Sequence, residues 1–390
     1  MKREKPGINT VCTHVGELQD KQYKGAISPL YMSSSYAYEN VDVKRYPRYF
    51  NTPNQEGLCK KIAALELCEA ALIFGSGMAA ISHTLLAFLQ KGDHLVLPKN
   101  LYGGTYNFVV EEFKKFGIEY SFAGGYKAAD ISEVIRANTK VLYIETPSNP
   151  LMEITDLEMV ANIAREHGLI TVIDNTFASP INQNPKLFGI DIMIHSATKY
   201  MGGHSDICAG AVAASEEKIK QIWNLAKNLG GSLSDYTVWL LERSIKTMAI
   251  RVKAQNRNAK KMAKWLDAHH LVQKVYYPGL KSHPDHEIAK RQMRGYTGML
   301  SFELDPSIDI NNFMDSLQLI KPSMSLAGIE STILSPIKTS HALLSENERK
   351  RQGIEDGLLR FSIGIEEKDD LVADIEQAFE KVTKKQLQNT

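Results

Sequence analysis

The sequence predicts an α/β protein with a mostly parallel central sheet, followed by a smaller α+β domain at the C-terminal end. Short apolar runs alternate with helix-length segments through the middle of the chain, and Gly, Pro, Asn or Asp residues bound these runs. Strands separated by helices are typical of right-handed βαβ crossovers, which place the strands parallel. From about Ser244 the pattern changes to a long basic helix and separated strands, which indicates the second domain.

The central sheet is predicted from apolar runs of strand length. These runs are Ala71–Phe74, His94–Leu97, Lys140–Glu145, Leu169–Asp174, Asp191–His195 and Gly210–Ala213. Two segments between them, Tyr102–Phe116 and Asp156–His167, have the length of helices. Residues 1–50 have little periodicity and many turn residues, so we expect an N-terminal arm there and the larger domain over residues 51–245.

The smaller domain is expected over residues 246–390. A basic, polar helix is predicted over Lys246–His269, and a turn follows at Tyr276–Gly279. Two strands and a closing helix complete the prediction, at Met299–Leu304, Leu359–Ile363 and Lys368–Lys381.

Composition excludes several classes of protein. The 390 residues carry 46 Lys and Arg against 45 Asp and Glu, so the basic excess of a nucleic-acid-binding domain is absent. The apolar stretch Ala71–Leu89 is interrupted by polar residues and falls short of the ~20 residues of a membrane span. The N-terminus lacks the apolar core of a signal peptide, and the 4 cysteines form no CxxC pair. We therefore expect a cytoplasmic protein that binds neither nucleic acid nor membrane.

A glycine-rich turn follows the first predicted strand. Gly75-Ser76-Gly77-Met78 leads into a helix-compatible segment. Glycines let the backbone approach an anion, and the first N–H groups of a helix point at it. The sequence therefore favours a phosphate site here, with a plain strand-to-helix turn as the alternative.

A carboxylate follows the strand that ends at Ile173. Asp174 comes directly after four apolar residues, where an unpaired charge is costly to bury. A structural, paired aspartate explains this position as well as a functional one does. In the functional interpretation, Asp174 holds a ring nitrogen in its protonated state.

A lysine follows the next predicted strand. Lys199 lies in Ser196-Ala197-Thr198-Lys199-Tyr200, between hydroxyl-bearing residues and ahead of Gly202-Gly203. Most lysines are simply solvated. A partly desolvated lysine, however, has a lowered pKa and forms a Schiff base readily.

These three signals together favour pyridoxal phosphate as the cofactor. A phosphate cradle, an aspartate for the ring nitrogen and a lysine for the aldehyde are what this cofactor requires. The hydroxyls of Ser196 and Thr198 offer further phosphate contacts, and the ring of Tyr102 offers a stacking surface.

The chain resembles the Cys/Met-metabolism group of pyridoxal-phosphate enzymes, which includes cystathionine γ-synthase, cystathionine γ-lyase, methionine γ-lyase and the homoserine-ester sulfhydrylases. The matching motifs include GSGMAAI, LYGGTY, ETPSNP, DNTFASP, HSATKYMGGHSD, SLAGIES and LLRFSIGIE. The resemblance implies the aspartate aminotransferase-like fold (fold-type I) for the domain over 51–245. It also implies a homotetramer, a dimer of dimers with shared active sites.

The resemblance also implies a role for each matching residue. Lys199 matches the lysine that binds the cofactor and moves protons, and Arg360 matches the arginine that grips the substrate carboxylate. Tyr46 and Arg48 match a pair that reaches the phosphate of the adjacent subunit, where Tyr46 assists proton transfer. The remaining matches are Asp174 for the ring nitrogen, Gly77, Met78, Ser196 and Thr198 for the phosphate, Tyr102 for stacking and catalysis, and Asn149 and Ser325 near the substrate carboxylate.

The implied reaction is γ-elimination or γ-replacement at a C–S or C–O bond of a sulfur amino acid or homoserine derivative, most like a cystathionine γ-lyase or γ-synthase. O-acetylhomoserine sulfhydrylase and methionine γ-lyase activities stay open, because Met324, Asn107 and Gly104 differ from residues common in the better-known members. A catalytically idle scaffold is a remote alternative that intact Lys199 and Asp174 speak against. No metal site is expected, since His283-Pro284-Asp285-His286 has the features of a solvated loop.

Overall fold

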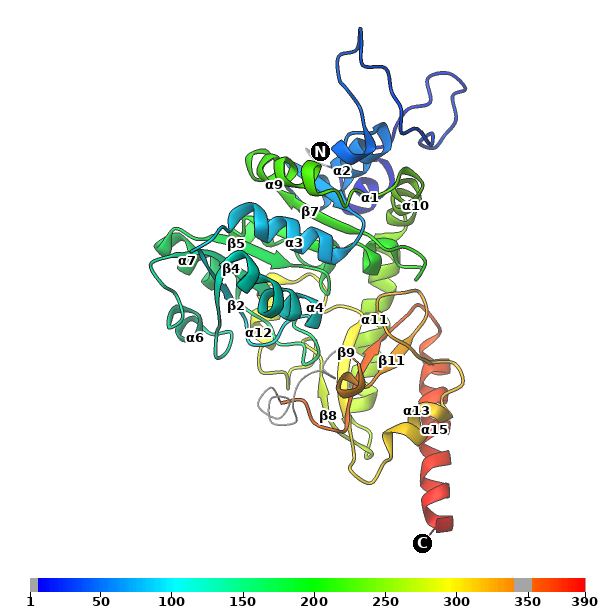
Figure 1. Cartoon of the computed structure of the whole chain (residues 1–390). Helices are drawn as coiled ribbons and strands as arrows, with labels where there is room; N and C mark the ends of the chain where they lie inside the picture. Colours follow the sequence, from blue (N-terminus) through cyan, green and yellow to red (C-terminus); the bar gives the residue numbers. More distant parts are fainter. Residues whose placement is uncertain (1–5, 340–352, 390) are drawn as a thin grey trace, which may run out of the picture.

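The computed structural model describes residues 6–339 and 353–389 and contains two sheets joined by a long helix (Figure 1). The seven-stranded sheet has the order β1-β7-β6-β5-β4-β2-β3, and the five-stranded sheet has the order β10-β11-β12-β9-β8. In the larger sheet only β7 runs antiparallel to its neighbours, so the predicted mostly parallel sheet is confirmed.

Apart from β3, the strands of the larger sheet agree with the predicted runs to within one residue at each end. They are β1 Ala70–Phe74, β2 His94–Leu97, β3 Glu119–Phe122, β4 Thr139–Glu145, β5 Ile170–Asp174, β6 Ile192–Ser196 and β7 Gly210–Ala214. The strand β3 was not predicted. It is a short edge strand whose first residue is exposed and whose other residues are half-buried, so it lacks the apolar run of its neighbours.

Helices cover both faces of this sheet. One face packs against α3 Gly77–Phe88 and α9 Glu216–Leu229, and the other packs against α2 Pro53–Glu66 and α7 Leu157–His167. The helix α2 begins with a capping box between Thr52 and Gln55. The predicted helix 102–116 begins one residue later in the structure and is helical from there on, as α4 Gly103–Asn107, the π-helical segment η2 Phe108–Glu112 and α5 Phe113–Phe116.

The smaller sheet is antiparallel except for its β10–β11 edge. Its strands are β8 Val272–Tyr276, β9 Met299–Leu304, β10 Lys321–Pro322, β11 Thr332–Leu334 and β12 Leu358–Ser362. Helices α13 Ile310–Ser316 and α15 Lys368–Asn389 pack against each other beside it. The helix α15 extends beyond the predicted end at Lys381.

The predicted helix 246–269 differs from the structure at its start. A break at Lys246 and Thr247 separates α10 Asp235–Ile245 from α11 Met248–Asp267. In Figure 1, α11 runs from the larger sheet to the smaller one, where it packs on β8 and β9. The domain boundaries at 50/51 and 245/246 stay predictions.

The N-terminal arm has few regular elements. It contains α1 Ile8–His14 and the short 3₁₀ helix η1 Pro47–Tyr49, and the chain between them extends away from the sheets (Figure 1). The arm is anchored at its base, because the buried Lys61 Nζ donates to the carbonyl of Cys12 at 2.9 Å.

Candidate active site

The carboxyl ends of β4, β5 and β6 meet beside the N-terminus of α3. Ligands bind at this edge in open α/β sheets. A residue of the smaller sheet reaches the same place, because Arg360 on β12 donates to the side chain of Asn149, which follows β4. Both sheets therefore contribute side chains to one site.

Gly77 and Ser196, two of the residues predicted to bind the phosphate, lie side by side. A Cβ added at Gly77 would lie 2.8 Å from the Ser196 Cβ, so only glycine allows this close approach. Ser76 caps α3 by accepting from the amide of Ala79 at 3.0 Å. The first amides of a helix have no acceptor inside it and can bind an anion, and Ser196 lies beside this helix N-terminus at Gly77.

Asp174 is buried at the carboxyl end of β5. Its Oδ1 accepts from the amide of Thr176 at 3.0 Å. Burial raises the pKa of the Asp174 carboxyl, and its hydrogen bonds to Thr176 oppose the shift. A protonated ring nitrogen beside Asp174 would supply the cation that a buried carboxylate needs.

Lys199 lies in the tight turn η4 Thr198–Gly202 after β6, with a non-helical backbone (φ −87°, ψ −120°). Burial, with a smaller contribution from the nearby Arg360 charge, lowers the pKa of Lys199 to about 8. Its Nζ donates to the Ser325 hydroxyl at 2.7 Å. A lysine with this pKa is partly neutral near physiological pH and can act as a nucleophile.

Arg360 is buried, and within the described residues its Nε has no hydrogen-bond partner. Its Nη1 donates to Asn149 Oδ1 at 3.1 Å, and its Nη2 donates to the Ser325 carbonyl at 2.9 Å. Burial lowers the pKa of Arg360 to about 10, and the nearby Glu145 carboxylate opposes this shift. A buried guanidinium with an unpaired N–H donor can form a charge-assisted hydrogen bond with a substrate carboxylate.

Tyr102 lies at the start of α4 and is 46% exposed. Its amide donates to Glu145 Oε2 at 2.8 Å, which fixes the backbone. A Cβ added at Gly104 would lie 2.5 Å from Tyr102 Cε1 and 3.0 Å from Met78 Sδ. The structure therefore brings Tyr102 and Met78 together over Gly104.

Replacing Gly104 with alanine is expected to lower kcat about tenfold without destabilising the fold, because the new methyl group displaces the Tyr102 ring. Alanine is itself favoured over glycine in a helix. Gly124→Ala is the matched control, since a Cβ there meets nothing within 4 Å. Steady-state kinetics with thermal melting checks this, and equal kcat values for the two variants would contradict it.

Three of the predicted site residues, Thr198, Tyr46 and Arg48, have side-chain contacts that do not involve Lys199 or Arg360. The Thr198 hydroxyl is held by Ala209, donating to its carbonyl at 3.1 Å and accepting from its amide at 3.0 Å. Arg48 lies over the rings of Tyr46 and Tyr49 and donates to the Lys227 carbonyl on α9. Within the described residues, no hydrogen bond or ion pair joins Tyr46 or Arg48 to Lys199 or Arg360.

Glu145 and Thr176 also lie at this site and were not predicted from the sequence. Glu145 is buried at the end of β4, and its pKa is raised to about 8 by burial and by the nearby Asp174 charge. It follows an apolar strand just as Asp174 does, so the same signal was available. Thr176 accepts from the Ser196 amide through its Oγ1 at 2.8 Å and thereby links the ends of β5 and β6.

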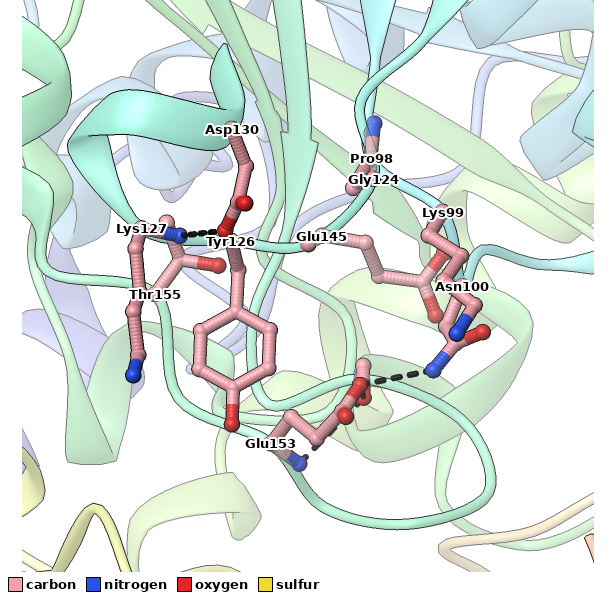
Figure 2. A pocket seen from close by; sticks show the side chains of 12 residues that line it. Pro98, Lys99, Asn100, Gly124, Tyr126, Lys127, Asp130, Glu145, Glu153 and Thr155 are labelled. Carbon is pink, nitrogen blue, oxygen red and sulfur yellow. Dashed lines mark hydrogen bonds between the residues drawn. The ribbon is translucent and has the colours of Figure 1, made fainter. Parts of the chain in front are cut away.

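A polar cavity of about 340 Å³ lies next to the site (Figure 2). Glu145 and Ser148 line it together with Asn100, Tyr126 and Glu153, and Glu153 accepts from Asn100 Nδ2 at 2.8 Å. None of the predicted site residues is in its lining. It therefore borders the site without containing it.

The site residues fit pyridoxal phosphate group by group. The α3 amides and Ser196 suit the phosphate, the buried Asp174 suits the ring nitrogen, and Lys199 suits the aldehyde. In the described part of the chain no cluster of three His, Cys, Asp or Glu side chains has the geometry of a metal site. No helix within residues 6–339 and 353–389 has the length and apolar character to cross a membrane.

Comparison with known proteins agrees with this class of enzyme. The family model described as "Cys/Met metabolism PLP-dependent enzyme" matches residues 9–380. The cystathionine gamma-lyase of Bacillus subtilis (strain 168) is 41% identical, with 96% of this chain and 99% of the relative covered. A cystathionine beta-lyase of Lactococcus lactis subsp. cremoris (strain MG1363) is 40% identical over the same shares.

A solved structure has the same overall fold. The cystathionine gamma-lyase of Lactobacillus plantarum, complexed with L-serine, superposes with a TM-score of 0.93 at 36% identity, covering 97% of this chain and 100% of that one. Fold and site thus define a pyridoxal-phosphate-dependent enzyme. The chain belongs to the Cys/Met metabolism PLP-dependent enzyme family, and the predicted fold class and cofactor are confirmed.

Proposed function

We propose that the protein is a carbon–sulfur lyase that cleaves the Cγ–S bond of cystathionine. The products are cysteine, 2-oxobutanoate and ammonia, with one water consumed. The observation that carries this proposal is the bridge at Ser325, which accepts from Lys199 through its hydroxyl and from Arg360 through its carbonyl. The proton-carrying amine and the carboxylate anchor are thereby held at a fixed separation, as an α-amino acid requires.

Arg360 would bind the substrate carboxylate. Its guanidinium is oriented by Asn149 and by the Ser325 carbonyl, and the unpaired Nε supplies a donor. A guanidinium held by two acceptors grips a carboxylate bidentately and fixes the direction of the Cα–H bond.

Lys199 would carry the protons. Its amine, with a pKa of about 8, accepts the proton from Cα and returns it at a later carbon. The bound cofactor supplies an electron sink for the α-carbon. The long lysine side chain would serve both Cα and Cβ, and removal of the Cβ proton would permit the Cγ substituent to leave. Asp174, which accepts from the Thr176 amide, would keep the ring nitrogen of the bound cofactor protonated.

Met324 and Asn107 favour a second candidate substrate. Met324 precedes Ser325 and is 70% exposed, and Asn107 lies on α4 after Tyr102. Neither side chain offers a charge to the distal ammonium and carboxylate of cystathionine. This favours γ-elimination from a smaller thioether or thiol amino acid, methionine or homocysteine.

A substrate panel with the cofactor-loaded enzyme tests the proposal. Cystathionine, homocysteine, methionine, and O-acetyl- and O-succinyl-homoserine with cysteine or sulfide are compared by kcat/KM, and 2-oxobutanoate and pyruvate are quantified separately. We expect 2-oxobutanoate and cysteine from cystathionine with the highest kcat/KM. Pyruvate and homocysteine as main products would indicate Cβ–S cleavage, and faster thioether formation from the homoserine esters would indicate replacement; either result contradicts the proposal.

The assembly belongs to the same proposal. We infer a homotetramer, a dimer of dimers in which Tyr46 and Arg48 reach the phosphate of the neighbouring subunit. The arm supports this, because Tyr23, Met32 and Tyr38 are at least 68% exposed and would be covered by a partner. Sedimentation equilibrium measures the assembly directly. The free cysteines support a reducing, cytoplasmic setting.

A further inference from the structure

Glu66 is in an unfavourable position for a carboxylate. It is the last residue of α2 and is fully buried. The C-terminal end of a helix carries the negative end of the helix dipole, which repels a carboxylate. A buried charge also loses its hydration. A residue that violates both preferences requires a compensating contact.

The compensating contacts come from two neighbouring strand ends. His195 Nε2 donates to Glu66 Oε1 at 2.5 Å, and Asn175 Nδ2 donates to the same oxygen at 3.0 Å. The second carboxylate oxygen, Oε2, has no partner in the described structure. His195 and Asn175 are buried as deeply as Glu66, so all three side chains are shielded from solvent.

Each of these partners is adjacent in sequence to a residue of the cofactor site. Asn175 follows Asp174, and His195 precedes Ser196. Successive side chains of a strand point to opposite faces of its sheet. His195 is paired with Ala211, which packs in the core on the α2 face, whereas Asp174 and Ser196 lie on the α3 face with the cradle at Gly77. Glu66 thus connects the two strand ends from the face opposite the cofactor.

Further contacts hold Asn175 in place. The backbone N–H of Asn175 donates to the Ile194 carbonyl at 2.9 Å, and Gln183 Nε2 donates to the side-chain Oδ1 of Asn175 at 3.0 Å. The side chain of Asn175 is therefore oriented to donate to Glu66. Displacement of Glu66 would move Asn175 and His195, and with them the backbone of Asp174 and Ser196.

We propose that Glu66 is a positioning residue for the cofactor, which acts through Asn175 and His195 to fix the spacing between Asp174 and Ser196. This inference rests on the proposed function, in which Asp174 contacts the ring nitrogen of the bound cofactor and Ser196 contacts its phosphate. The ring-nitrogen partner and the phosphate contact come from adjacent strands, so their separation sets how the cofactor ring is held. A charged side chain that spans both strand ends fixes that separation better than packing alone.

Glu66→Gln tests the proposal, because glutamine keeps the size of the side chain and an oxygen acceptor but removes the charge. Three readouts are measured: pyridoxal phosphate affinity of the cofactor-free protein, the visible circular dichroism of the bound cofactor, and kcat and KM separately. We expect the cofactor to bind about tenfold more weakly, its circular dichroism to change, and kcat to fall about tenfold with KM within twofold.

Glu376→Gln is the matched control, because Glu376 pairs with His269 at 3.5 Å on the smaller domain. It is expected to leave all three readouts unchanged. Wild-type values of all three readouts in Glu66→Gln would overturn the proposal, even if the melting temperature falls. If Glu66→Gln does not fold, His195→Gln is measured in the same way and judged by the same outcomes.

The proposed function can fail independently of this inference. If the wild-type protein binds pyridoxal phosphate through Lys199 but Glu66→Gln matches it, only the positioning role is wrong. If the wild-type protein does not bind the cofactor at Lys199, the site assignment itself is wrong.

Discussion

Replacing Lys199 with alanine is expected to lower kcat at least ~10³-fold while the protein stays folded. In the proposed function, this side chain supplies both the nucleophile that holds the cofactor and the base that moves the substrate protons. Burial lowers the pKa of Lys199 to about 8, and the Ser325 hydroxyl orients its amine, so the side chain is suited to both tasks. A truncated side chain therefore removes covalent attachment and proton transfer together. The measurement is steady-state turnover of cystathionine with saturating cofactor.

Lys220→Ala is the control for this prediction, because Lys220 is an exposed lysine on α9 and is expected to be neutral for activity. Circular dichroism and gel filtration establish that both variants fold. Turnover by Lys199→Ala within tenfold of the wild type would show that another residue carries the protons.

Replacing Arg360 with lysine is expected to lower kcat/KM about 100-fold, mainly by raising KM. The charge is conserved, but the planar fork that donates to Asn149, Ser325 and the substrate carboxylate is lost. A lysine ammonium acts as a point charge and leaves the Asn149 oxygen and the Ser325 carbonyl without their donors. Two lost charge-assisted hydrogen bonds account for an effect of this size. The measurement is kcat and KM over a wide concentration range of the amino acid.

Arg294→Lys is the matched control, since Arg294 also donates to carbonyls, those of Ile181 and Pro180, away from Lys199. It is expected to lower the melting temperature and leave KM within twofold of the wild type. Equal KM values for Arg360→Lys and the wild type would remove Arg360 from the substrate site.

The residues at the strand ends were predictable from local sequence. Asp174, Ser196 and Lys199 each follow an apolar run, and a polar residue at that position is conspicuous because burial of its charge or hydroxyl is costly. Glu145 follows the same rule and was missed, because no partner in its own segment indicated a role. Local patterning thus located the carboxyl ends of β5 and β6, the edge of the sheet where we propose that the cofactor binds.

The substrate side of the site was not predictable from local sequence. Arg360 and Asn149 are 211 positions apart, and Lys199 and Ser325 are 126 apart. No periodicity connects segments at such separations, so only resemblance to known enzymes indicated these residues. The strands β3, β8, β10 and β11 were not predicted, because β3 and β8 are too polar and β10 and β11, of two and three residues, are too short to give a clear apolar pattern.

Lys199 is expected to hold the cofactor at the edge of the larger sheet, where side chains of both sheets meet. Reduction of the cofactor-loaded protein with borohydride, followed by proteolysis and mass spectrometry, tests this most directly. We predict that the cofactor mass is found on the peptide containing Lys199 and disappears in Lys199→Ala. Recovery of that mass on another lysine, such as the buried Lys61, or on no lysine would contradict the claim.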